Sequence, residues 1–276
     1  MAKRKMGLTE KKIEQMEKEG RGQGEGSKYK PWLNIQDFSS KGLSTRTMGW
    51  KTNRIHQFLS KLEKDYYYIC EWGSLIVDIR EQYPLHRIDT LKIAEEKDIK
   101  HPTDPKTSVP IVMTTDFLLT VKTEEGIKLI ARTIKPSNEL EKHRVIEKFE
   151  IEREYWYQRN VDWGIVTENE IPKILVNNVE WLHTSYFFHE DLSPSAYKTL
   201  LQQLKYSLSR KGVSLIEILT QFDIQYGLEN GMALELFKHL IAVKEIKVDM
   251  FQPIHTHLFV EDLILEGAQN WEKGAV

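Results

Sequence analysis

Two neighbouring apolar runs constrain the fold more than any other feature of the chain. Residues 111–119 and 127–136 each have the length and apolar content of a strand, and the turn-rich segment 122–126 joins them. This arrangement predicts an antiparallel β-hairpin. Asp116 lies inside the first run and Lys135 near the end of the second. Burying either charge without a partner would be costly, so the two form either a salt bridge or part of a functional site.

Length and composition indicate a globular protein. The chain has 276 residues, of which 40% are hydrophobic, so it can bury a sizeable core, and its length favours two domains. It has no apolar run of 18 residues, and charged residues follow its first segment. We therefore expect neither a membrane span nor a secretion signal, and we expect the protein in the bacterial cytoplasm.

Cysteine content and charge exclude several classes of site. A single cysteine, Cys70, cannot form an internal disulfide or a zinc site built from several cysteines. The formal net charge of −2 argues against strong, nonspecific attraction to a polyanion. Any contact with nucleic acid is therefore expected to be local or assisted by a partner.

The first 170 residues are expected to form a mixed α/β layer around the hairpin. Apolar spacing predicts a helix from Thr52 to Trp72, a strand over residues 75–80, a charged helix over 138–159 and a strand over 163–167. The stretch 89–110 is expected to be irregular. Residues 1–31 carry nine basic and five acidic side chains and include a short helix that Thr9 could cap. This segment is either a mobile, solvated tail or a basic arm that contacts nucleic acid or a partner.

Residues 171–276 have a different, mainly helical character. Helices are predicted over residues 172–182, 194–211, from Ser214 onward, and over 230–243. Residues 244–260 alternate like a two-stranded β wing. Consecutive helices followed by such a hairpin suggest a winged-helix module, which can place one helix in the major groove of DNA.

Glu63, Asp116 and Lys135 form the candidate chemical site. Glu63 lies beside the apolar stripe of the predicted helix 52–72, so a helix carboxylate could approach the two charged residues of the hairpin. Two carboxylates can bind one or two Mg²⁺ ions, and a lysine can hold the attacking water or offset charge developing on phosphorus. Oxygen ligands select Mg²⁺ or Mn²⁺ over zinc. The spacing alone leaves a structural salt bridge as the commoner explanation.

Eight short segments of the chain carry a family resemblance. They are residues 19–24 (EGRGQG), 30–33 (KPWL), 78–85 (DIREQYPL), 99–102 (IKHP), 115–118 (TDFL), 134–136 (IKP), 152–156 (EREYW) and 178–182 (NVEWL). Together they resemble the TnsA family, the endonuclease subunits of heteromeric transposases. The resemblance is in register over about residues 19 to 182. It implies a restriction-endonuclease-like N-terminal domain, residues 1–170, and a winged-helix-like C-terminal domain, residues 171–276, for contacts with partners or DNA.

Resemblance to the TnsA family also implies an activity and its partners. The protein would cut the 5′ strand at transposon ends, while a separate TnsB-like transposase subunit cuts and joins the 3′ ends under a TnsC-like ATPase regulator. Matching the family motif assigns catalytic roles to Glu63, Asp116 and Lys135. The resemblance also implies Mg²⁺ as cofactor, with two ions per site and Mn²⁺ as a possible substitute.

Thr133 departs from the family pattern, because the residue two before the lysine usually carries a carboxylate or an amide. Glu63 and Asp116 would then be joined in the metal shell by the backbone carbonyl of Ile134 or Thr133, or by water. Two alternatives stay open. One is a stand-alone restriction-type or junction-resolving nuclease, and the other is a winged-helix DNA-binding regulator whose acidic residues are structural.

Overall fold

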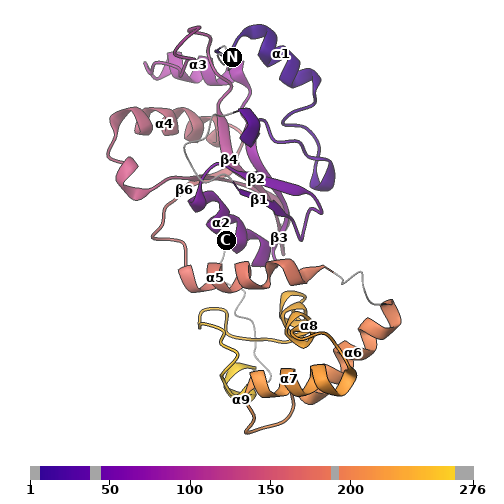
Figure 1. Cartoon of the computed structure of the whole chain (residues 1–276). Coiled ribbons are helices and arrows are strands. Elements are labelled where there is room, and N and C mark those ends of the chain that lie inside the picture. Colours follow the sequence, from indigo (N-terminus) through magenta and orange to yellow (C-terminus); the bar gives the residue numbers. More distant parts are fainter. Residues whose placement is uncertain (1–6, 38–44, 188–192, 265–276) are drawn as a thin grey trace, which may run out of the picture. The chain divides into compact units, whose positions relative to one another are not determined.

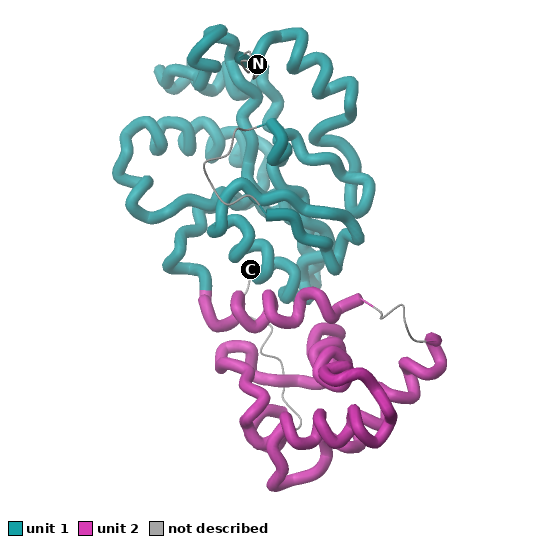
Figure 2. The backbone as a smooth tube through the Cα atoms, viewed as in Figure 1, with its two compact units in different colours: residues 1–171 teal, residues 172–276 magenta. Residues whose placement is uncertain are grey.

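The computed structural model describes residues 7–37, 45–187 and 193–264. The chain forms two compact units, residues 1–171 and 172–276 (Figure 2). None of the helices in the described parts of the chain is long and apolar enough to cross a membrane.

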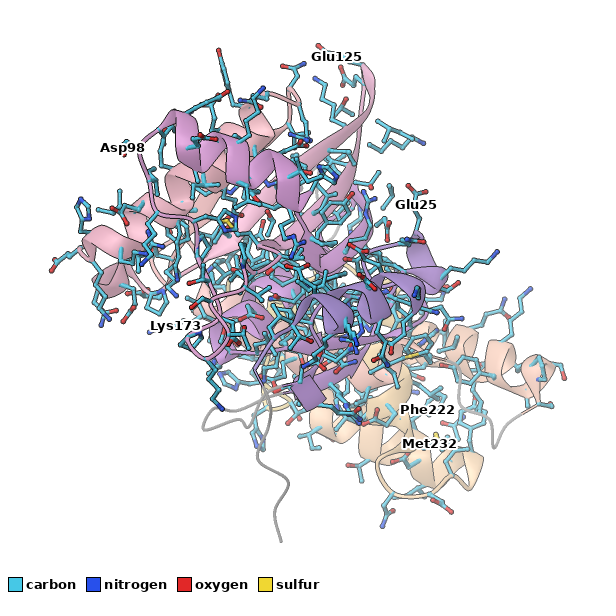
Figure 3. The ribbon with its side chains drawn as sticks, turned by 90° about the horizontal axis from the view of Figure 1, so that it is seen from above. Glu25, Asp98, Glu125, Lys173, Phe222 and Met232 are labelled. Atoms are coloured by element: carbon cyan, nitrogen blue, oxygen red, sulfur yellow. The ribbon has the colours of Figure 1, made fainter. Side chains whose placement is uncertain are left out.

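A four-stranded mixed sheet forms the centre of the first unit (Figure 1). Its strands, in spatial order, are β3 (Ile76–Pro84), β4 (Thr114–Thr123), β5 (Gly126–Ile134) and β6 (Asp162–Val166). β4 pairs antiparallel with both β3 and β5, whereas β5 and β6 are parallel. The predicted hairpin is thus confirmed as β4 and β5, and Figure 3 shows Glu125 at its outer end.

Helices α2 (Lys61–Trp72) and α4 (His143–Tyr157) cover opposite faces of this sheet. Phe117 of β4 packs against Tyr66 of α2, with ring centroids 5.4 Å apart. The next residue, Leu118, belongs instead to the core cluster that contains Ile151 and Trp156 of α4. Because successive side chains of a strand point to opposite faces, one helix lies on each side of β4. The mixed α/β layer architecture is therefore confirmed.

Two predicted segments of the first unit are wrong in part. Residues 52–72 are not one helix, because β2 (Ile55–Phe58) pairs with β1 (Thr45–Met48) and Ser60 caps α2 only afterwards. The apolar spacing of this segment runs on through both elements and so resembled one helical period. The stretch expected to be irregular contains helix α3 (Arg87–Glu96), while α4 begins at His143, after a short 3₁₀ turn (Ser137–Glu139).

The described part of the N-terminal segment packs onto the first unit. Thr9 caps α1 (Glu10–Lys18), as predicted. Ile13 and Met16 of α1 are buried in a cluster with Trp32. The mobile-tail interpretation is therefore wrong for residues 7–31. The glycine-rich loop that follows α1 comes so close to the end of β3 that a Cβ on Gly22, where φ is +76°, would lie 2.2 Å from a carbon of Pro84.

The regular secondary structure of the second unit, over its described residues, is helical. Its helices are α5 (Lys173–Leu182), α6 (Pro194–Ser207), α7 (Leu215–Tyr226), α8 (Met232–Ala242) and the short α9 (Val260–Leu263), with a 3₁₀ turn at His183–Tyr186. Residues 244–260 contain isolated bridges but no strand, so the predicted β wing is wrong. Ile246, Val248 and Met250 are buried and alternate with exposed residues, as in a strand, but this segment forms no hairpin. The winged-helix assignment is not confirmed.

Candidate active site

Glu63 is fixed by the first turn of α2. Ser60 is the N-cap of this helix, and its hydroxyl accepts a hydrogen bond from the Glu63 N–H. The Glu63 carboxylate reaches back and accepts from the Leu59 N–H at 3.0 Å and from the Ser60 hydroxyl at 2.8 Å. This is a variant of the capping box, because the carboxylate three residues after the cap accepts from the N–H of the residue before the cap and from the hydroxyl of the cap. The Glu63 side chain is buried, with 8% of its surface exposed.

Asp116 occupies the place where β4 and β5 separate. The last paired residues of these strands are Phe117 and Arg132, and beyond them the Ile134 N–H donates to the Asp116 carboxylate at 2.8 Å. If the ladder continued, the Ile134 N–H would donate to the main chain of β4. Here it donates to the Asp116 side chain instead. On the other side, the Gln82 amide of β3 donates to Asp116 at 3.1 Å.

The two carboxylates lie close enough to perturb each other. Burial, followed by repulsion from Asp116, raises the pKa of Glu63 to about 7. Burial also raises the pKa of Asp116, to about 6, although the Ile134 N–H, Gln82 and the charge of Lys135 act in the opposite direction. A pair of neighbouring anions whose charged forms are both disfavoured is a typical place for a bound cation.

Lys135 follows β5 directly and is half-buried. Its backbone N–H donates to the Val166 carbonyl of β6 at 3.0 Å, which fixes the main chain at the end of the sheet. Its ammonium group acts electrostatically on Asp116. The structure therefore brings together the three side chains that the sequence predicted, from α2, β4 and the end of β5. Their catalytic roles stay predictions.

Thr133 has a different set of contacts. Its hydroxyl donates to Glu152, a buried glutamate of α4 that also accepts from the Thr115 hydroxyl at 2.7 Å and from the Trp163 indole at 3.0 Å. Burial raises the pKa of Glu152 to about 7, with the charge of Asp116 adding to the rise. Thr133 thus helps to tie β4, β5 and α4 together. Sequence reasoning missed Glu152, which is one of several glutamates in a charged helix.

Gln82 is the second site residue that sequence reasoning missed. Its neighbours Glu81 and Tyr83 pair with Phe117 and Thr115, so Gln82 lies opposite Asp116 across the β3–β4 ladder. Its φ is +49°, a left-handed conformation that is uncommon for a residue other than glycine. Such backbone outliers cluster at functional sites.

Comparison with known proteins identifies the family of this chain. Residues 74–168 match the family model described as TnsA-like endonuclease N terminal, and residues 170–250 match the one described as TnsA endonuclease C terminal. The chain is also 37% identical over 274 residues to the Escherichia coli protein named "Transposon Tn7 transposition protein TnsA", covering 99% of this chain and 98% of that one. The chain belongs to the TnsA endonuclease family.

Membership of the TnsA family confirms the resemblance and extends it into the C-terminal unit. The N-terminal family model covers Asp116 and Lys135 but begins after Glu63, which lies within the region aligned with the E. coli relative. These three side chains therefore belong to a chain of an endonuclease family, and their roles in cleavage stay predictions.

The donor set of this TnsA-family site fits a hard divalent cation. Glu63 and Asp116 offer carboxylate oxygens, and Mg²⁺ is commonly bound through one or two carboxylates with water completing its shell. Among the described residues, no group of three or more His, Cys, Asp or Glu side chains is placed to hold a metal ion. A further ligand from the described residues, as they are arranged here, would therefore be an amide, hydroxyl or backbone oxygen.

Proposed function

We propose that this chain is a Mg²⁺-dependent endonuclease that hydrolyses the 5′, non-transferred strand at transposon ends. It would act with a TnsB-like transposase subunit, which processes the 3′ ends, and with a TnsC-like ATPase regulator. The observation that carries the proposal is the buried pair of carboxylates, Glu63 and Asp116, with the charge of Lys135 acting on Asp116. Family membership supports endonuclease chemistry at this pair.

Each residue of the site would have a separate task. Glu63 and Asp116 would hold Mg²⁺, or Mn²⁺ in its place and as two ions in the full site. When bound, the metal polarises the scissile phosphate, lowers the pKa of the attacking water and neutralises the leaving oxygen. Lys135 would hold that water or offset charge developing on phosphorus. The raised pKa values of the two carboxylates mean that metal binding releases protons and weakens below neutral pH.

Ile134 is better placed than Thr133 to add a backbone carbonyl. In a strand, the N–H and C=O groups of one residue project toward the same edge. Because the Ile134 N–H faces Asp116, its carbonyl projects toward that side as well. Lys135 bonds to β6 through its N–H, and by alternation the carbonyl of Thr133 also projects toward β6. Water would fill the remaining positions.

The C-terminal unit is proposed to contact DNA or the partner subunits. Its helices surround buried residues of α8, such as Phe237 and Leu240, which supports a unit with its own core. The described residues of this unit form no β wing, so they do not support a winged-helix-like role. The proposed contacts with DNA or partner subunits therefore rest on family membership.

Cleavage by the reconstituted transposase tests the proposed function. We expect Asp116→Asn to abolish 5′-strand cleavage at transposon ends while joining of the 3′ strand by the partner subunit continues. Persistence of 5′ cleavage in this variant would refute the assignment of the site. Efficient DNA cleavage by the purified chain without partners would instead favour a stand-alone restriction-type or junction-resolving nuclease.

A further inference from the structure

A third oxygen ligand is missing from the pair of carboxylates. The Thr133 hydroxyl, at the position where an acidic or amide ligand is expected, donates to Glu152 instead. No third His, Cys, Asp or Glu side chain joins Glu63 and Asp116 among the residues that the structure describes. Side-chain oxygens of other kinds at this site therefore become important.

Gln82 places an amide at the two carboxylates. Its nitrogen donates to Asp116 at 3.1 Å, and a hydrogen bond from the same side chain acts on Glu63. The Gln82 side chain is buried, with 3% of its surface exposed. The positive end of the amide dipole thus faces two anions, at the position where a cation would be most favourable.

The surroundings of Gln82 allow its amide to turn. The Thr114 hydroxyl donates to the Gln82 side-chain oxygen at 3.1 Å. A hydroxyl is both donor and acceptor, so after a rotation of about 180° Thr114 could accept from the amide nitrogen instead. The amide oxygen would then face the carboxylates. Both orientations keep the buried amide hydrogen-bonded, which removes the main penalty for turning it.

The backbone of Gln82 is held in place while the side chain turns. Its φ of +49° is unfavourable in a residue other than glycine, so the surrounding structure must hold it. The Trp32 N–H donates to the Gln82 carbonyl at 3.2 Å, and the β3–β4 ladder continues on both sides of the residue. The N-terminal segment therefore helps to aim this side chain at the site.

We propose that Gln82 is a metal ligand, whose amide donates to the carboxylates in the metal-free protein and turns its oxygen to the ion when metal binds. This inference rests on the proposed function, because it concerns the same metal site. The proposal places on β3 the side-chain oxygen ligand that Thr133 does not supply. In the metal-free state the amide partly offsets the repulsion between Glu63 and Asp116.

Binding of Mn²⁺, measured by electron paramagnetic resonance and calorimetry at pH 8 without DNA, tests this inference. We expect Gln82→Leu to weaken Mn²⁺ binding at least tenfold and Gln82→Glu, which restores an oxygen, to bind at least as tightly as the unmodified protein. Gln158→Leu is the matched control, because the Gln158 amide donates only to Glu154 on the exposed end of α4. This control should bind Mn²⁺ normally.

Two results would overturn the inference. Binding by a folded Gln82→Leu variant within twofold of the unmodified protein would show that the amide is only a donor to Asp116. If that variant does not fold, a crystal structure of the unmodified protein with Mn²⁺ decides, because a Gln82 oxygen outside the coordination shell would exclude the ligand role. Loss of binding in Gln82→Leu but not in Glu63→Ala would instead contradict the proposed site itself.

Discussion

Neutralising Glu63 should stabilise the metal-free protein while removing its activity. Glu63→Gln keeps the shape of the side chain, and its oxygen can still accept from the Leu59 N–H, while the Ser60 hydroxyl can turn to accept from the new amide. The substitution therefore removes mainly the charge. Because burial and Asp116 raise the pKa of Glu63, the folded protein binds a proton more tightly than the unfolded chain does. The folded state is then most favoured below pH 4.5 and loses stability as the pH rises through about 7.

The size of this effect follows from the displacement of the pKa. A rise from 4.5 to about 7 corresponds to about 3 kcal/mol at roughly 1.4 kcal/mol per pH unit. The gain from the substitution is smaller than this value for two reasons. Part of the energy is repulsion shared with Asp116, and the new amide is hydrogen-bonded less well than the carboxylate. We therefore expect Glu63→Gln to raise the free energy of unfolding by about 2 kcal/mol at pH 8. This corresponds to about 4–8 °C in the melting temperature for a unit of this size.

Thermal unfolding in EDTA, followed by circular dichroism at pH 5 and pH 8, measures the effect. The gain should be present at pH 8 and nearly absent at pH 5, where Glu63 is protonated in the folded protein. Glu124→Gln, in the exposed turn between β4 and β5, is the matched control and should change neither temperature. Excess Mg²⁺ should reverse the order, because bound ligand stabilises the unmodified protein more. An equal gain at both pH values, or a loss at pH 8, would refute the electrostatic reasoning.

Substitutions at three further positions separate chemistry from structure. Lys135→Ala should lower the rate of end cleavage about 10²- to 10³-fold and leave Mn²⁺ affinity nearly unchanged, and a parallel loss of affinity would show that the lysine acts by holding Asp116 ionised. Glu152→Ala should lower the free energy of unfolding, measured in urea, by about 2–4 kcal/mol, because the groups that donate to the Glu152 carboxylate lose their acceptor. Glu152→Gln should cost less, and the reverse order would contradict the structural role of Glu152. Glu81→Gln should cost about 3 kcal/mol near pH 7 by leaving Arg54 buried without its anion. His56 and Arg54 outweigh burial and lower the pKa of Glu81 to about 2, so this cost should fade as the pH falls from about 4.5 toward 2; a cost that stays constant would contradict it.

The hairpin and its two charges could be predicted because strand signals are local. Apolar runs of the right length, separated by a turn-rich segment with glycine, identify β4 and β5 without knowledge of the rest of the fold. Glu63 was also accessible, since a carboxylate beside the apolar stripe of a helix must lie near the sheet. The boundary between β2 and α2 was missed even though Ser60 and Glu63 have the spacing of a capping box.

The other residues of the site depend on register, which the sequence does not display. Gln82 reaches Asp116 only because β3 pairs with β4 in a particular alignment, and a shift of one residue would turn it to the other face. Glu152 differs from its neighbours Glu150 and Glu154 only in facing the sheet. The prediction of a β wing was wrong for a related reason. Alternation over residues 244–260 predicted a strand, but the apolar residues of this segment are buried in a mainly helical unit.

A left-handed backbone and two neighbouring buried carboxylates occur together at the candidate site, and the surrounding structure opposes their relaxation. Gln82 has a left-handed backbone between Glu81, whose carboxylate is bound by Arg54 and His56 in the interior, and Tyr83, which pairs with Thr115. On the far side of the sheet, Glu152 joins β4 to β5 just where these strands separate to admit Asp116. If the metal-free site relaxed, its two carboxylates would move apart or would form ion pairs within the protein. These flanking networks instead keep the two anions together, so that the energy stored in their repulsion is released when a cation binds.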